Sequence, residues 1–134
     1  MTPLTLANRT LLGLLIVFAA APVMAEWSQV ARSVEATIFY DRDSLRKSGS
    51  MVKMWTLTNF ASTEIIEGKS HRSAKSQYEY DCAEERYRLL ATIFYELVGG
   101  AGKVTASEAS LGPWYPVAPQ SMAQRLWKVA CGAK

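Results

Sequence analysis

Polar and apolar residues alternate along the middle of the chain, from Lys69 to Cys82, in a way that predicts a β-strand. Side chains on a strand point alternately to its two faces. One face then carries Ser76, Tyr78, Tyr80 and Cys82, and the other carries Gln77, Glu79 and Asp81. Cys82 therefore points to the side of the tyrosines. A bond from Cys82 to Cys131 would fasten the C-terminal segment to that face of a sheet.

Runs of β-branched and aromatic residues, which favour strands, occur elsewhere in the chain. They predict strands at 34–40, 51–60, 86–95 and 103–109 and a short segment at 45–47, while 26–33 is either a first strand or an ordered lead-in. Turn-forming residues separate these runs, as in Asp41 to Ser44 and Gly99 to Gly102. The polar stretch Ala61 to Gly68 is expected to be a loop before the strand that ends at Cys82.

The C-terminal part of the sequence predicts a connector followed by a helix. Residues 111–119 contain three prolines and are expected to stay extended, outside any ladder or helix. Ser121 and Gln124 form a capping-box pattern, and apolar residues at helical spacing follow up to Gly132. Roughly six antiparallel strands and one C-terminal amphipathic helix packed on one face make an α+β fold.

The N-terminal segment predicts export. A weakly basic start with Arg9 precedes eleven apolar residues, Leu11 to Ala21, and small residues stand at 23–25. We expect a signal peptide at 1–25, cleaved after Ala25. The apolar run is shorter than the roughly 20 residues that a membrane-spanning helix needs. No cysteine follows this run, so we expect a mature protein without a lipid anchor or a transmembrane segment, in the periplasm or secreted.

The remaining residues, 26–134, suit a single domain. Without Arg9 the chain carries 14 Lys and Arg, from 15, against 12 Asp and Glu, a net charge of +2. This small excess does not indicate a nucleic-acid partner. Two cysteines in an exported chain predict one disulfide, Cys82 to Cys131. Closing that loop of about 50 residues stabilises the folded state by about 4 kcal/mol in the chain-entropy model.

No set of residues in the sequence indicates a catalytic site, a metal site or a cofactor site. His71 is the only histidine, and the polar residues around it predict a surface position. Gly102-Lys103 lacks the earlier glycine of a phosphate loop, because Leu97 stands at that position. Asp41 and Asp43 start a calcium-like spacing, which Leu45 interrupts. We expect a non-enzymatic protein.

Two groups of residues remain as candidates for binding. The basic side chains Lys69, His71, Arg72 and Lys75 precede the tyrosines on one strand. Such a run is usually only a solvated face, but exposed basic strands also bind polyanions. Trp114 and Tyr115 stand among prolines, where they are open to contact, whereas Trp27, Trp55 and Trp127 lie in apolar runs and are expected in the core.

A larger set of residues, taken in order, resembles the surface adhesin protein E family over nearly the whole of 26–134. The matching residues are Trp27, Val30, Tyr40, Asp41, Gly49, Val52, Met54, Trp55, Gly68, Lys69, Arg72, Ser73, Tyr80, Asp81, Cys82, Arg88, Gly100, Gly102, Trp114, Pro119, Ser121, Leu126, Trp127, Ala130, Cys131 and Gly132. The resemblance implies a curved antiparallel sheet with a C-terminal helix tied to its concave face by the disulfide.

The resemblance also implies adhesion to host cells and extracellular-matrix proteins. The founding member is an outer-membrane lipoprotein, whereas this chain has no cysteine after its apolar run. Two hypotheses follow. The first is a binding module that holds a host or matrix protein, or a polyanion, through the basic strand. The alternative is a periplasmic structural or housekeeping domain of the same fold.

Overall fold

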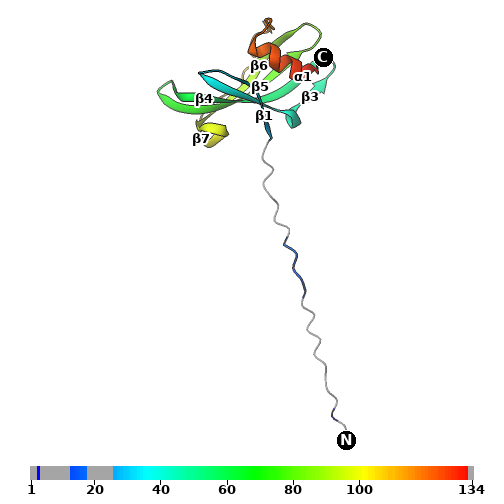
Figure 1. The fold of residues 1–134 in the computed structure, drawn as a ribbon, viewed down its shortest axis with the longest axis vertical. Helices are drawn as coiled ribbons and strands as arrows, with labels where there is room; N and C mark the ends of the chain where they lie inside the picture. Colours follow the sequence, from blue (N-terminus) through cyan, green and yellow to red (C-terminus); the bar gives the residue numbers. More distant parts are fainter. Residues whose placement is uncertain (1–2, 4–12, 18–25, 133–134) are drawn as a thin grey trace.

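The computed structural model describes residue 3, residues 13–17 and residues 26–132. The predicted cleavage site after Ala25 lies outside the described residues. From Trp27 onward the chain forms one antiparallel sheet and a single described α-helix (Figure 1).

Six strands follow one another across the sheet in the order β1-β2-β4-β5-β6-β7, and two short strands pair outside this path. The strands are β1 (Trp27–Arg32), β2 (Ala36–Asp41), β3 (Arg46–Ser48), β4 (Met51–Ile66), β5 (Lys69–Asp81), β6 (Arg86–Leu97), β7 (Ala101–Glu108) and β8 (Tyr115–Pro116). β3 pairs with β4, and β8 pairs with β6. The six antiparallel strands along this path confirm the predicted fold class. Of the two alternatives for residues 26–33, the structure shows the strand, at Trp27–Arg32.

Helix α1 (Met122–Cys131) lies across one face of the sheet (Figure 1). Ser121 caps its N-terminus by accepting a hydrogen bond from the Gln124 amide at 3.1 Å. Gln124 accepts in turn from the amide of Gln120, not from that of Ser121, so the box is shifted by one residue. Gly132 ends the helix at φ 63°, a conformation that glycine adopts without strain.

The core lies between α1 and the tyrosine face of the sheet. Val52 and Met54 of β4 and Tyr80 of β5 are at most 1% exposed and pack against Leu126 and Ala130 of the helix. Burying a side chain such as that of Leu126 contributes about 1.5–3 kcal/mol. Because a ten-residue helix is unstable alone in water, this contact and the disulfide hold it in place.

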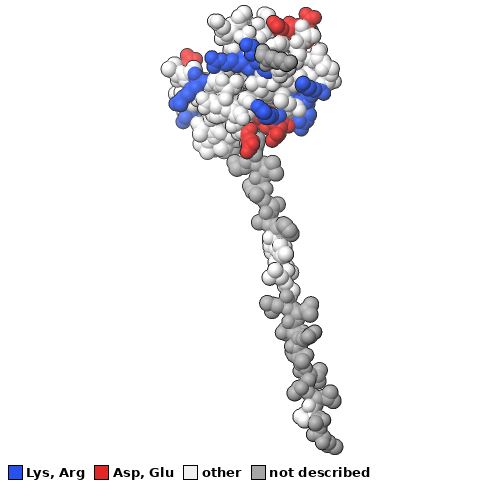
Figure 2. Space-filling model, turned by 45° about the vertical axis from the view of Figure 1, so that its right-hand side comes forward, with Lys and Arg blue, Asp and Glu red and all other residues white. Residues whose placement is uncertain are grey.

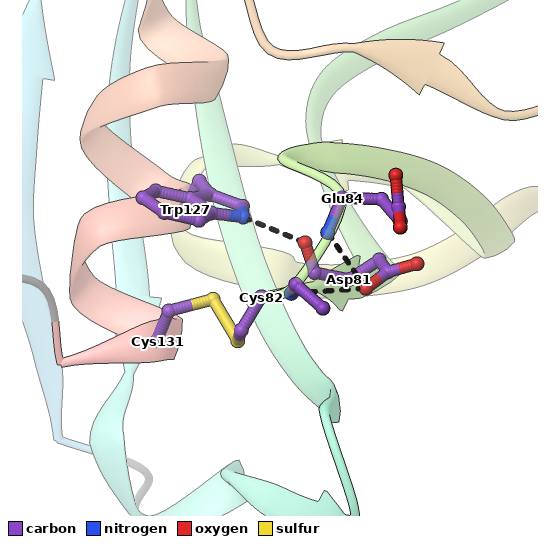
Figure 3. Close-up of a disulfide and its surroundings, with 6 residues drawn as sticks. Asp81, Cys82, Glu84, Trp127 and Cys131 are labelled. Carbon is purple, nitrogen blue, oxygen red and sulfur yellow. Dashed lines mark hydrogen bonds between the residues drawn. A yellow bond between two sulfur atoms is a disulfide. The ribbon is translucent and has the colours of Figure 1, made fainter.

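The predicted disulfide is present, with the Cα atoms of Cys82 and Cys131 5.6 Å apart. It joins the residue after β5 to the last residue of α1 (Figure 3). One turn earlier on the helix, Trp127 donates from Nε1 to the carbonyl oxygen of Asp81 at 3.0 Å. The end of β5 is therefore bound to the helix by one covalent bond and one hydrogen bond.

The prediction of a polar loop at 61–68 was wrong. β4 continues to Ile66, and Ile66 pairs directly with Lys69. The turn consists of Glu67 and Gly68, which have φ values of 53° and 77°. Positive φ at both turn positions fits a type I′ hairpin. The stretch looks like a loop in sequence because all of residues 61–70 are exposed, so no apolar alternation marks the strand. We call residues 61–70 the β4–β5 arm.

The prediction that no residue of 111–119 joins a ladder was also wrong. Tyr115 and Pro116 form β8 against Tyr87 and Arg86. Proline is tolerated there because this is a two-residue strand at the margin of the sheet. The amide of Val117 supplies the adjoining hydrogen bond, to the carbonyl oxygen of Glu85 at 2.9 Å.

Candidate binding surfaces

Lys69 lies at the start of β5, in the exposed β4–β5 arm. The strand is thirteen residues long, so Lys69 and Asp81 are roughly 40 Å apart at about 3.3 Å per residue. The candidate residues are spread along this length and do not form one site. Figure 2 likewise shows the basic side chains of one face in several separate groups.

The predicted surface position of His71 was wrong, since its side chain is 0% exposed. Its Nδ1 atom shares a hydrogen bond with the Thr105 hydroxyl of β7. The ring lies 4.8 Å from the ring of Phe94. Nε2 has no hydrogen-bond partner among the described residues. The sequence around His71 is polar, but the covering residue comes from a strand two places away in the sheet. His71 is therefore placed to join β5 to β7.

Arg72 is half-buried as well. Its Nη2 donates to the carbonyl oxygen of Phe60 at 3.5 Å, and its Nε is buried without a partner among the described residues. Phe60 belongs to the part of β4 where the pairing with β5 is irregular, between Asn59 and Glu64. Arg72 thus fills an interruption in the ladder.

Lys75 is half-buried on the face of the sheet opposite α1. Its ammonium lies 5.2 Å from the centre of the Tyr95 ring and 5.8 Å from that of Trp27. Both distances are within the range of a cation–π interaction. Lys75 is thus separated from Lys69 by both position and surroundings.

Trp114 and Tyr115 lie at the other end of the sheet, next to the start of β6. The guanidinium carbons of Arg86 and Arg88 lie 4.5 Å and 4.4 Å from the centre of the Trp114 ring. Tyr115 is 51% exposed, and its ring lies 5.9 Å from that of Tyr87. Trp114 is therefore engaged by two arginines, and Tyr115 is the more open of the pair.

The same two arginines form ion pairs with buried carboxylates of β5. Arg88 binds Glu79 at 2.6 Å, and Arg86 binds Asp81 at 3.0 Å. Burial alone would raise the pKa of Asp81. The hydrogen bonds from Arg86, Glu84 and Ala83 outweigh that effect and, with the charge of Arg86, hold the pKa below its ordinary value. Asp81 is therefore an ionised structural group beside the disulfide (Figure 3).

A hollow opens at the Lys69 end of the sheet, between β5, β6 and β7. Its lining consists of Lys69, Ser70, Glu96, Leu97, Lys103, Val104 and Thr105. Two cations and one carboxylate give it a net positive charge. We did not expect Lys103 here, because the pairing of β6 with β7 shifts register twice. Because of these shifts, counting residues along the two strands does not reveal that Lys103 and Lys69 line the same hollow.

The described residues contain no group of three or more His, Cys, Asp and Glu side chains arranged to hold a metal ion. Among the described helices, none is long and apolar enough to cross a membrane.

The model of the family described as surface-adhesin protein E matches residues 27–132. The chain belongs to this family. The family consists of binding proteins. Membership of a surface-adhesin family implies that this chain is exported or displayed at the cell surface. A search of curated proteins gives no significant match.

Crystal structures of Haemophilus influenzae protein E have a similar fold. Crystal form II of that protein is 15% identical, with a TM-score of 0.67, covering 82% of this chain and 90% of that one. A second structure is 17% identical, with a TM-score of 0.65 and coverages of 82% and 86%. The protein from a non-typeable strain is 16% identical, with a TM-score of 0.62 and coverages of 83% and 80%. At these identities the likeness concerns the fold.

Proposed function

We propose that this chain is an adhesin-like binding module that holds a host or extracellular-matrix protein at the hollow and the adjoining β4–β5 arm. The observation that carries the proposal is the combination of exposed apolar and cationic side chains at this end of the sheet. Ile66 is 39% exposed and pairs with Lys69, which lines the hollow together with Lys103. Ile65, 64% exposed, points to the other side of the same arm.

The arm favours a protein partner over a simple polyanion. Exposed large apolar side chains next to charged ones are typical of protein-binding surfaces. Ile66 and Lys69 are paired across the hairpin and so point to the same side of it. A partner that presents an apolar side chain flanked by carboxylates fits this pair and the net charge of the hollow.

Electrostatic attraction is expected to set the salt dependence of this binding. Lysines at the rim of an interface act chiefly on the association rate, and their effect is screened by salt. Trp114, Tyr115 and Lys75 lie elsewhere on the sheet and form no part of this surface. His71 and Arg72 would support it indirectly, by holding β7 and β4 against β5.

The test is binding of the exported protein to an immobilised basement-membrane extract. The double variant Lys69→Gln/Lys103→Gln removes the two cations of the hollow. Its matched control, Lys47→Gln/Lys128→Gln, removes two exposed cations far from it. We expect the first to bind about tenfold more weakly, a change of about 1.4 kcal/mol, and the second to bind as the wild type does.

Binding of the wild type should also fall as the salt concentration rises. Equal binding of both double variants would refute the hollow as the site. Salt-dependent binding to heparin beads alone, with none to matrix proteins, would replace the protein partner with a polyanion. A protein recovered only from the periplasm would support the structural alternative.

A further inference from the structure

The face of the sheet opposite α1 carries a second cluster of aromatic residues. Residues that pair directly across antiparallel strands point to the same side. Phe39, Leu57 and Lys75 form one such row across β2, β4 and β5. Trp55 lies two residues before Leu57 on β4 and so shares its face. Trp27 and Tyr95 approach the same lysine from β1 and β6.

These aromatic side chains are not in the core, contrary to the expectation for Trp27 and Trp55. Trp27, Phe39, Trp55 and Tyr95 are each half-buried, whereas Leu57 among them is buried, at 2% exposed. Trp127, by contrast, packs against the core as expected. The one helix of the described chain covers the opposite face. We call Trp27, Phe39, Trp55, Tyr95 and Lys75 the aromatic face.

Lys75 is a fixed cation at the centre of this face. Its ammonium lies over two rings, and the two ion pairs of the described residues both belong to other side chains. Its stem runs past Gly100, where an added Cβ atom would collide with Cε of Lys75. A side chain at Gly100 would therefore push the lysine aside, so the backbone leaves room for it.

Two primary amides accompany the lysine. Gln77 pairs with Trp55, and Gln29 pairs with Phe39, so both belong to this side of the sheet. Gln29 is exposed and Gln77 half-buried, and neither side chain makes a hydrogen bond within the described residues. An amide offers both donors and acceptors, which suits the hydroxyl groups of a sugar.

We propose that the aromatic face binds an anionic glycan, with sugar rings stacked on the half-buried rings that Lys75 does not cover, those of Phe39 and Trp55, and an acidic group on Lys75. Aromatic rings supply rigid apolar area, the amides supply hydrogen bonds, and the ammonium supplies one unpaired charge. This site is distinct from the hollow and stands whether or not the proposed function does.

The test is isothermal titration of the full exported protein with three probes. These are a hyaluronan octasaccharide, which carries carboxylates, a heparin octasaccharide, which also carries sulfates, and neutral maltooctaose. We expect at least one acidic probe to bind and maltooctaose to bind at least tenfold more weakly. The difference between the two acidic probes tells whether a carboxylate or a sulfate occupies the Lys75 position.

Variants then locate the binding. Lys75→Met keeps an unbranched stem against Gly100 and removes the charge, and we expect it to weaken binding by about tenfold. Trp55→Ala removes one ring and should also weaken binding. Two controls should leave the binding unchanged: Lys128→Met, on an exposed position of the helix, and Lys69→Gln/Lys103→Gln, in the hollow. An unchanged melting temperature in Lys75→Met shows that lost binding is not lost folding.

Three results would overturn the proposal. The first is the absence of binding to either acidic probe. The second is equal binding by Lys75→Met and the wild type, or a loss confined to the hollow variant. The third is self-association of the wild type that Trp55→Ala or Lys75→Met abolishes, which would assign the aromatic face to a second copy of the chain.

Discussion

The indole of Trp127 donates its hydrogen bond to the carbonyl oxygen of Asp81, the residue immediately before Cys82. The disulfide partner, Cys131, lies four residues after Trp127, on the same side of α1. Two successive turns of the helix are thus attached to the last residue of β5 and the residue after it. This arrangement fixes the helix both along and across the strand, and Leu126 is held over the core as a result.

Replacing both cysteines, Cys82→Ser/Cys131→Ser, should lower the free energy of unfolding by about 2–5 kcal/mol, because the unfolded chain regains the entropy of an open loop. Thermal melts of the variant and the wild type measure the loss. Thiol labelling of the native wild type should find no free cysteine. An unshifted melting temperature would mean that the packing of Leu126 and the Trp127 bond suffice to hold the helix.

Thr105→Val should destabilise the fold by about 1–3 kcal/mol, because it leaves Nδ1 of the buried His71 without a partner while keeping the side-chain shape. Thr63→Val is the matched control, since Thr63 is exposed in the β4–β5 arm. Chemical denaturation of the three proteins at neutral pH decides the matter. Equal stability of both variants would show that the histidine contributes nothing through this bond.

Gly100→Ala should destabilise the protein by more than Gly49→Ala does. Both glycines have positive φ, 68° and 60°, so each substitution introduces backbone strain of about 1–2 kcal/mol. Only at Gly100 does the new Cβ meet another side chain, that of Lys75. Equilibrium unfolding in urea gives the comparison, and equal losses would show that Lys75 moves away at no cost.

Asp81→Asn should remove part of the acid sensitivity of the fold. The folded pKa of Asp81 is below its unfolded value, so the ionised carboxylate stabilises the protein above the unfolded pKa of about 3.9. That stabilisation is lost as the pH falls through the folded pKa. The stability difference between wild type and variant should therefore be largest near pH 7 and shrink below about pH 4. A difference independent of pH would contradict the role assigned to the charge.

Local alternation sufficed to predict the strand that ends at Cys82, and a capping pattern sufficed for the helix after Ser121. Both are short-range signals, and two cysteines permit only one disulfide within the chain. The extension of β4 through residues 61–66 was missed because a strand exposed on both faces has no apolar period. The pairing of β8 was missed because Pro116 is excluded only from the interior of a sheet.

Which side chains the sheet buries was harder to predict than where its strands lie. His71 is buried by a residue 34 positions away, on a strand that is not its neighbour. Trp27 and Trp55 lie in apolar runs, yet the one described α-helix packs on the other face of the sheet. The candidate cations therefore divide among three surroundings: Lys69 joins Lys103 at the hollow, His71 and Arg72 are enclosed, and Lys75 lies among aromatic rings. No periodic pattern in the sequence shows which of these surroundings each cation has.

Adhesion of intact cells to a matrix-coated surface tests the proposed binding function most directly. Cells that produce the wild type should adhere, and cells that produce Ile65→Ser/Ile66→Ser should lose most of that adhesion. The matched control, Leu111→Ser, alters a side chain that is 69% exposed on the distant connector and should adhere normally. Equal adhesion by the arm variant and the control, at equal surface amounts of protein, would contradict the assignment of binding to the β4–β5 arm.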